Sequence, residues 1–176
     1  MGDYAAGTGT STLSRSLSKE LGLRWLNSGE RYRKIASDRG ISLGELGRIA
    51  EEGPEIDYII DDAQREMAAE AGGIFEGRLS GHVLDADLKI LLKADRRLRA
   101  ERIATREKKL LEDALQEAKG REECEARRYE KYYNIDVRDL SVYDLVIDTG
   151  TWDERGVGAI VLAAVRTLED EESSSS

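Results

Sequence analysis

Apolar residues recur at helical spacing through most of the chain, and short continuous apolar runs interrupt them. The helical spacing predicts helices near residues 10–21, 29–39, 42–52, 55–71, 95–106, 110–133 and 157–168, where 110–133 is one long charged helix or a helix pair. The short runs predict strands near residues 2–5, 23–26, 73–76, 88–92 and 144–148, although the first is poor in Val, Ile and Leu. Alternating strands and helices are typical of an α/β fold in which helices cover both faces of a parallel sheet.

A run of small residues lies between the first predicted strand and the first predicted helix. Residues 7–12 read Gly-Thr-Gly-Thr-Ser-Thr. When Gly9 is aligned with the second glycine of the phosphate-loop pattern G-x-x-x-x-G-K-[ST], Tyr4 replaces the first glycine and Thr10 replaces the lysine. The small residues still allow successive backbone N–H groups to face one anion at the start of a helix. The run is therefore either a phosphate loop or a turn that caps the helix.

Composition narrows the class of protein. The 176 residues fit one domain, placed at 1–168, and the acidic and serine-rich residues 169–176 are predicted to be disordered. The net charge of −9 disfavours nucleic-acid binding. There is no run of eighteen apolar residues and no charged-then-apolar leader, so we expect a cytoplasmic protein with no membrane partner.

The chain has a single cysteine, Cys124, and a single histidine, His82. These counts exclude an internal disulfide and a zinc site built from Cys and His. We expect His82 to be packed and hydrogen-bonded, and Cys124 to have no catalytic role.

Several short segments follow the phosphate-loop candidate in order. They read Ser-Gly-Glu-Arg-Tyr-Arg at 28–33, Pro-Glu-Ile-Asp at 54–57, Glu-Gly-Arg-Leu-Ser-Gly at 76–81, Ala-Asp-Leu-Lys-Ile at 86–90, Arg-Ile-Ala-Thr-Arg-Glu at 102–107, Arg-Tyr-Glu-Lys-Tyr-Tyr at 128–133 and Ile-Asp-Val-Arg-Asp-Leu-Ser-Val-Tyr-Asp-Leu-Val-Ile-Asp-Thr at 135–149. Together, though not singly, they make residues 7–165 resemble the archaeal-type cytidylate kinases of the P-loop nucleoside-monophosphate kinase family.

The resemblance implies a three-layer P-loop fold with a five-stranded parallel sheet, NMP-binding helices within residues 28–71 and a helical lid within residues 107–133. It implies an enzyme that uses ATP and Mg²⁺ to phosphorylate CMP or dCMP in pyrimidine nucleotide metabolism, and we expect it to act as a monomer. Two alternatives stay open. One is a kinase for another base, and the other is a nucleotide-binding module that has lost catalysis, of which Tyr4 and Thr10 would be the marks.

The resemblance also implies three groups of site residues. The ATP phosphate loop would comprise Ala5, Ala6, Gly7, Thr8, Gly9, Thr10, Ser11 and Thr12, with the Ser11 hydroxyl also a ligand of Mg²⁺. The catalytic arginines would be Arg78, Arg102, Arg106, Arg121 and Arg128. The CMP site would comprise Ser28, Arg33, Asp57, Asp61, Gln64 and Arg78.

The arginine spacing agrees with this chemistry. Phosphoryl transfer to a phosphate oxygen needs cations and positioning but no general base. Arg102 and Arg106 are four residues apart, and Arg121 and Arg128 are seven apart, so each pair shares a helix face. The resemblance places the first pair at the entrance of the lid and the second on the lid. The alternative is that they are solvated arginines paired with neighbouring glutamates.

The acceptor residues have comparable alternatives. Arg33 and Arg78 follow predicted strands, at the carboxyl edge where parallel sheets bind ligands. The resemblance assigns them the acceptor phosphate, with Ser28 as a hydroxyl partner, whereas a salt bridge to Glu76 is the alternative for Arg78.

Asp57, Asp61 and Gln64 share one helix face and could read the cytosine edge, or they could simply lie on an exposed face. We expect the tyrosines at 129, 132 and 133 to pack the lid helix onto the domain, with stacking on cytidine as the alternative.

Overall fold

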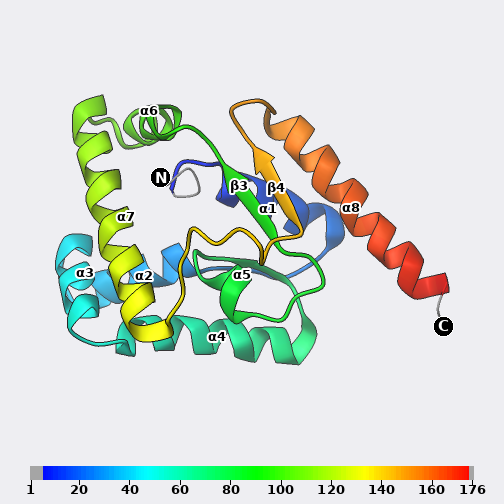
Figure 1. The fold of residues 1–176 in the computed structure, drawn as a ribbon, viewed down its shortest axis with the longest axis horizontal. Coiled ribbons are helices and arrows are strands. Elements are labelled where there is room, and N and C mark those ends of the chain that lie inside the picture. The colour runs from blue at the N-terminus through cyan, green and yellow to red at the C-terminus, as the bar shows by residue number, and fades with distance from the viewer. Residues whose placement is uncertain (1–5, 175–176) are drawn as a thin grey trace.

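The computed structural model describes residues 6–174, which form a mixed α/β fold with parallel strands (Figure 1). The helices are α1 (Thr10–Leu21), α2 (Ser28–Asp38), α3 (Leu43–Glu52), α4 (Glu55–Ala71), α5 (Ser80–Val83), α6 (Arg96–Glu107), α7 (Leu111–Tyr133) and α8 (Glu154–Ser174). The strands are β1 (Trp25–Asn27), β2 (Ile74–Glu76), β3 (Ile90–Lys93) and β4 (Leu145–Asp148). The predicted α/β class and the parallel strands are confirmed.

The strands pair in twos. β1 lies parallel to β2, with Trp25 opposite Ile74, and β3 lies parallel to β4, with Ile90 opposite Leu145. The described residues therefore do not form the single five-stranded sheet that was predicted. The first predicted strand, residues 2–5, lies outside the described residues, and its sequence lacks the Val, Ile and Leu that a central parallel strand needs.

Three apolar clusters hold the fold together. The first joins α1, β3, β4 and α8, the second joins α2, α3 and α4, and the third joins α6 to the start of α7. Their buried members are Leu13, Leu17, Leu92, Ile147, Val157 and Val161 in the first, Ala36, Leu46, Ala50, Ile56 and Ile60 in the second, and Ala100, Ile103 and Ala114 in the third. The β3–β4 pair with α1 and α8, the α2–α4 region and the α6–α7 region thus have separate cores.

A glycine and a capping box account for two of the helix boundaries. α1 ends at Gly22, whose φ of 68° is left-handed, and the side chain of Ser42 caps α3 in a capping box with Glu45. The loop after Gly22 delays β1 by two residues relative to the predicted start at residue 23.

The segment expected as one helix or a helix pair is the single helix α7, whereas two other local expectations need correction. The short helix α5 was not predicted. α8 continues to Ser174, so disorder from residue 169 is wrong for residues 169–174. The first part of α8 packs against α1, and because helix formation is cooperative, a helix held by that packing extends into the acidic residues at little cost.

Candidate active site

Two glycines shape the backbone of the phosphate-loop candidate. Gly7 and Gly9 both have a φ of 92°, and a Cβ on Gly7 would lie 2.7 Å from the carbonyl oxygen of Arg99. Only glycine fits Gly7 without displacing that backbone. Gly9 is the N-cap of α1 without a side-chain cap, and the first turn has no acidic residue. The N–H groups of this turn are therefore suited to bind an anion.

Thr10, which occupies the lysine position of the motif, binds within the loop. Its Oγ1 lies 2.9 Å from the Oγ1 of Thr8, which is buried. The loop thus has a hydroxyl pair where the motif has a cation. Ala5, the first residue of the predicted loop, lies outside the described residues, as does Tyr4.

A carboxylate lies beside the hydroxyl of Ser11. Ser11 Oγ donates to Glu76 Oε1 at 2.5 Å, and Trp25 Nε1 donates to Glu76 Oε2 at 3.1 Å. Burial raises the pKa of the Glu76 carboxyl, although the hydrogen bonds from Ser11 and Trp25 act in the opposite direction. Within residues 6–174, no group of three or more His, Cys, Asp or Glu could hold a metal ion. A metal here would therefore need oxygen ligands from its substrate as well.

Glu76 is a candidate site residue that the sequence analysis missed, because it was considered only as a partner for Arg78. The predicted salt bridge between Arg78 and Glu76 is wrong, since Arg78 pairs with Glu125. The available signal was its place at the carboxyl end of β2, where parallel sheets hold ligands.

Three of the predicted arginines surround one small cavity at the edge of the loop. Arg78, Arg106 and Arg121 line it together with Ala6 and Glu122. They come from the segment after β2, from the end of α6 and from α7, so the fold brings together residues far apart in the sequence.

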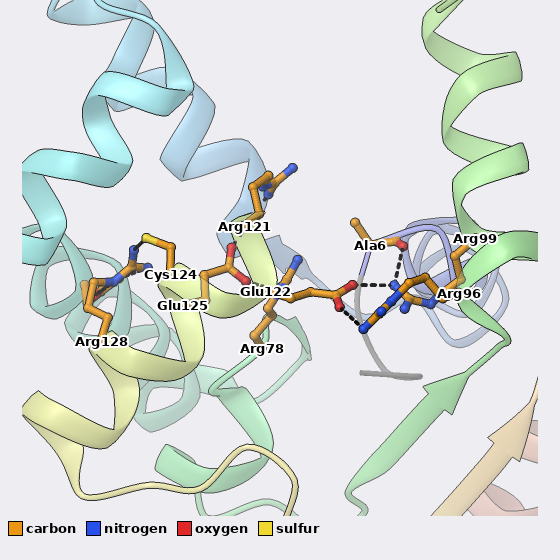
Figure 2. A network of polar contacts seen from close by, with 10 residues as sticks. Ala6, Arg78, Arg96, Arg99, Arg121, Glu122, Cys124, Glu125 and Arg128 are labelled. Atoms are coloured by element: carbon orange, nitrogen blue, oxygen red, sulfur yellow. Dashed lines mark hydrogen bonds and ion pairs between the residues drawn. The ribbon is translucent and has the colours of Figure 1, made fainter. Parts of the chain in front are cut away.

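Glu125 of α7 holds two of these arginines. Arg78 forms an ion pair with Glu125 in which both side chains are largely buried, and Arg121 Nη2 lies 3.8 Å from Glu125 Oε1. Figure 2 shows Arg78 and Arg121 on either side of this stretch of α7. Arg106 is more exposed and contacts Glu107 at 2.6 Å.

Arg102 contacts the loop itself. Its Nη1 donates to the carbonyl oxygen of Gly7 at 3.2 Å and to Thr149 Oγ1 at 2.9 Å, and its Nη2 donates to the Thr149 carbonyl at 2.7 Å. The reading of Arg102 as a solvated arginine paired with a glutamate is therefore wrong. Arg102 connects the phosphate loop to the turn after β4.

Arg128 lies apart from the cavity. It is 4% exposed, and its Nε and Nη2 donate to Asp57 Oδ2 and Oδ1 at 2.6 and 3.1 Å. Burial raises the pKa of the Asp57 carboxyl and outweighs the lowering effect of the Arg128 charge. Burial acts to lower the pKa of Arg128, but Tyr129 and Asp57 raise it more, so that its pKa is raised overall. In this arrangement the predicted pair of lid arginines is divided, because Arg121 faces the cavity and Arg128 faces α4.

The predicted base-reading residues are buried, so the alternative of an exposed helix face is wrong. Asp57 and Asp61 are each 5% exposed and Gln64 is fully buried. Asp61 accepts a hydrogen bond from the Tyr133 hydroxyl at 2.5 Å. Arg33, by contrast, is exposed on α2.

Gln64 belongs to a polar network around Gly77. Its amide donates to Ser28 Oγ, and its Oε1 accepts from Ser80 Oγ at 2.9 Å. A Cβ on Gly77 would lie 2.6 Å from Ser28 Oγ and 2.5 Å from Ser80 Oγ. Glycine is thus required next to Arg78, and the network fixes the segment from which that arginine projects.

The remaining predicted side chains have structural contacts. The tyrosines pack α7 onto the domain as expected: Tyr132 donates to the Glu51 carbonyl at 2.7 Å, and Tyr129 is buried. His82 packs edge-on against Tyr143, but its buried Nε2 has no hydrogen-bond partner among the described residues, so the expected hydrogen bond is wrong for this atom. No helix in the described range is long and apolar enough to cross a membrane.

The sequence profile of the cytidylate kinase-like family matches residues 3–151. The chain belongs to this family. It is 66% identical over 163 residues to a protein named cytidylate kinase from Methanothrix thermoacetophila, covering 93% of this chain and 95% of that protein. Another cytidylate kinase, from Methanocella arvoryzae, is 44% identical over 164 residues and is 94% covered. An uncharacterized protein from Eubacterium ventriosum has a similar structure, with a TM-score of 0.70 over 93% of this chain and 94% of its own; at 17% identity this likeness supports the fold alone.

Proposed function

We propose that this protein is a kinase that transfers the γ-phosphoryl group of ATP to CMP or dCMP, giving ADP and CDP or dCDP. The observation that carries the proposal is the convergence of Arg78, Arg106 and Arg121 on one cavity next to the phosphate loop. Phosphoryl transfer requires cations at one point, because charge develops on several phosphate oxygens there. These arginines supply the cations, and Glu107, Glu117 and Glu122 line the same cavity. The cytidylate kinases that resemble the chain over nearly its whole length support the choice of acceptor.

The donor side is the loop before α1. Its N–H groups would hold the β- and γ-phosphates of ATP, and Arg102 holds the back of the loop through the Gly7 carbonyl. Ser11 and Glu76 would hold Mg²⁺ together with phosphate oxygens, because a hydroxyl and a carboxylate are the hard oxygen ligands this ion prefers. When bound, the ion would neutralise charge on the donor phosphates.

The acceptor side is formed by the segment after β2 and by α2 and α4. Arg78 would bind the phosphate of CMP, with Ser28 and the exposed Arg33 beside it. Asp57 and Arg128 bind each other in this structure. With CMP bound, Asp57 would also accept from the exocyclic amine of cytosine, and Arg128 would donate to the ring acceptors. Asp61 and Gln64 lie on the same face of α4 as Asp57 and would complete the binding site for the cytosine base.

The chemistry requires little from the protein beyond these contacts. An oxygen of the CMP phosphate attacks the γ-phosphorus, and the bond from that phosphorus to the β-γ bridging oxygen breaks. Arg78, Arg106 and Arg121 stabilise the charge that moves between these oxygens. Residues 107–133 would act as a lid, with Arg121 approaching the phosphates as α7 closes, and residues 28–71 would close over the acceptor.

A coupled assay of ADP release with ATP and each of CMP, dCMP, UMP and AMP tests the proposal. We expect CMP and dCMP to have the highest kcat/KM. A kcat/KM for AMP or UMP as high as that for CMP would show that the proposed choice of acceptor is wrong. Tight ATP binding without turnover on any acceptor would show instead a nucleotide-binding module that has lost catalysis.

A further inference from the structure

Arg99 of α6 is a buried cation that the reaction described above does not use. Its side chain is entirely buried. Its Nε donates to the carbonyl oxygen of Ala94 at 3.0 Å, which fixes the guanidinium against the end of β3. A buried guanidinium is retained only where partners compensate its charge, so the remaining contacts of Arg99 indicate what it does.

One of these contacts is with the back of the phosphate loop. A loop that turns successive N–H groups toward an anion turns carbonyl groups away from it, and these carbonyls need donors. Arg99 Nη1 donates to the Ala6 carbonyl at 3.4 Å, next to the Gly7 carbonyl that Arg102 binds. Gly7 also packs directly on the backbone of Arg99. Arg99 and Arg102 therefore support consecutive carbonyls of the loop.

A second contact is with α7. The same nitrogen, Arg99 Nη1, donates to Glu122 Oε1 at 2.8 Å, and Glu122 Oε2 lies 3.5 Å from Arg96 Nη2. Figure 2 shows Glu122 reaching from α7 toward Arg96 and Arg99, with Ala6 beside them. Glu122 also lines the cavity that holds Arg121. A single guanidinium nitrogen thus connects the loop to the helix that we propose as the lid.

We propose that Arg99 is a positioning residue for the phosphate loop and that Glu122 couples it to α7, so that nucleotide binding by the loop and the position of α7 depend on each other. A displacement of α7 away from α6 breaks the ion pair between the buried Arg99 guanidinium and Glu122, which opposes that displacement. Binding at the loop favours the arrangement in which the bond is intact, and by linkage a closed α7 strengthens binding at the loop. The inference rests on the proposed function, because it takes ATP as the ligand of the loop.

The test uses Arg99→Lys and Glu122→Gln, each with a matched control. Lysine keeps the charge but not the planar fork that reaches Ala94, Ala6 and Glu122 together. Glutamine keeps the shape of Glu122 without its charge. The controls are Arg97→Lys on α6 and Glu123→Gln on α7, two exposed residues whose partners, Glu101 and Lys119, lie on their own helices.

The measurements are the Kd of a non-hydrolysable ATP analogue by calorimetry, with and without CMP, and the thermal unfolding midpoint. We expect Arg99→Lys and Glu122→Gln each to raise the Kd by about tenfold, the loss expected for one charge-assisted hydrogen bond. Each should also reduce the factor by which CMP changes that Kd. The variant that carries both changes should have a Kd no higher than that of the single variant with the higher Kd, because both changes break the same connection. The controls should stay within about twofold of the parent.

Two results overturn the inference. The first is a folded Glu122→Gln variant whose Kd is within twofold of the parent. This result rejects the coupling even if Arg99→Lys does not fold. The second is a lower unfolding midpoint with an unchanged Kd, which would reduce the pair to a structural contact. The proposed function can fail separately. If the variants bind the analogue more weakly than the parent does, but the parent phosphorylates no CMP, the proposed function is rejected and the inference about the loop stands.

Discussion

Replacing Arg78 with alanine separates catalysis from packing at the centre of the site. Arg78 lines the cavity with Arg106 and Arg121, and it is also the partner of Glu125 on α7. If it binds the reacting phosphates, its loss lowers kcat/KM, and if it serves only to compensate Glu125, its loss lowers stability alone. The variant therefore has two measurable consequences with different magnitudes.

The catalytic effect follows from the charge removed. Deleting one charged contact to a reacting phosphoryl group costs about 3 kcal/mol, or roughly two orders of magnitude in kcat/KM. The effect on stability follows from burial. The Arg78 and Glu125 side chains are 25% and 15% exposed, and without Arg78 the nearest cation to Glu125 is Arg121, at 3.8 Å. Leaving a largely buried carboxylate with that weaker partner costs about 1–3 kcal/mol of unfolding free energy.

Steady-state assays of ADP release and urea unfolding measure the two effects, and Arg78→Lys is the control. Lysine keeps the charge that Glu125 faces but loses the bidentate fork, so we expect stability close to that of the parent and kcat/KM still lowered by about tenfold or more. An Arg78→Ala variant with kcat/KM within threefold of the parent would refute the reasoning and reassign Arg78 to a structural ion pair.

Three further predictions concern the loop, α4 and α5. Thr10→Lys should change kcat by no more than about tenfold, because Thr10 is bonded within the loop and the arginines supply the cations; turnover only in the lysine variant would show that Thr10 disables the enzyme. Asp57→Asn leaves Arg128 buried without a carboxylate, so urea unfolding should show a loss of about 3 kcal/mol, and a loss under about 1 kcal/mol would contradict the pair's role. Burial lowers the pKa of His82, which faces Asp136, Asp139 and Lys89, so the folded protein binds fewer protons than the unfolded chain and stability falls as pH drops below about 6.5. His82→Phe keeps the contact with Tyr143 and should remove that part of the pH dependence; unfolding midpoints with the same slope between about pH 5 and 7 in both proteins would contradict this.

Local sequence signals determine most of the elements. α1 and α4 have the predicted bounds because glycine ends α1 and Gly53-Pro54 separates α4 from α3, while apolar spacing identifies the face that each helix buries. The strands are harder to delimit. Each has only three or four residues, so a difference of two residues is a large fraction of its length.

Helix spacing predicts which residues share a face, but it does not identify their partners. Arg121 and Arg128 lie two turns apart on α7, and a helix of 23 residues contacts different elements along its length. Arg121 therefore reaches the cavity near α6, whereas Arg128 reaches Asp57 on α4.

The ion pairs Arg78–Glu125 and Arg99–Glu122 also could not be predicted from the sequence. Each joins an exposed-looking charge on α7 to an arginine from another element, and nothing in the local pattern distinguishes it from solvated charge. The contacts of Glu76 could not be predicted either, because its partners, Ser11 and Trp25, are distant in sequence; only its place at the carboxyl end of β2 was a signal.

A competition experiment tests the central claim most directly. The protein is incubated with ATP labelled in the γ-phosphate and an equimolar mixture of CMP, dCMP, UMP and AMP, and the labelled products are separated at low conversion, so that their ratios report relative kcat/KM. The account predicts that the label appears mainly in CDP and dCDP. Label found mainly in ADP or UDP, or only in inorganic phosphate, would contradict it.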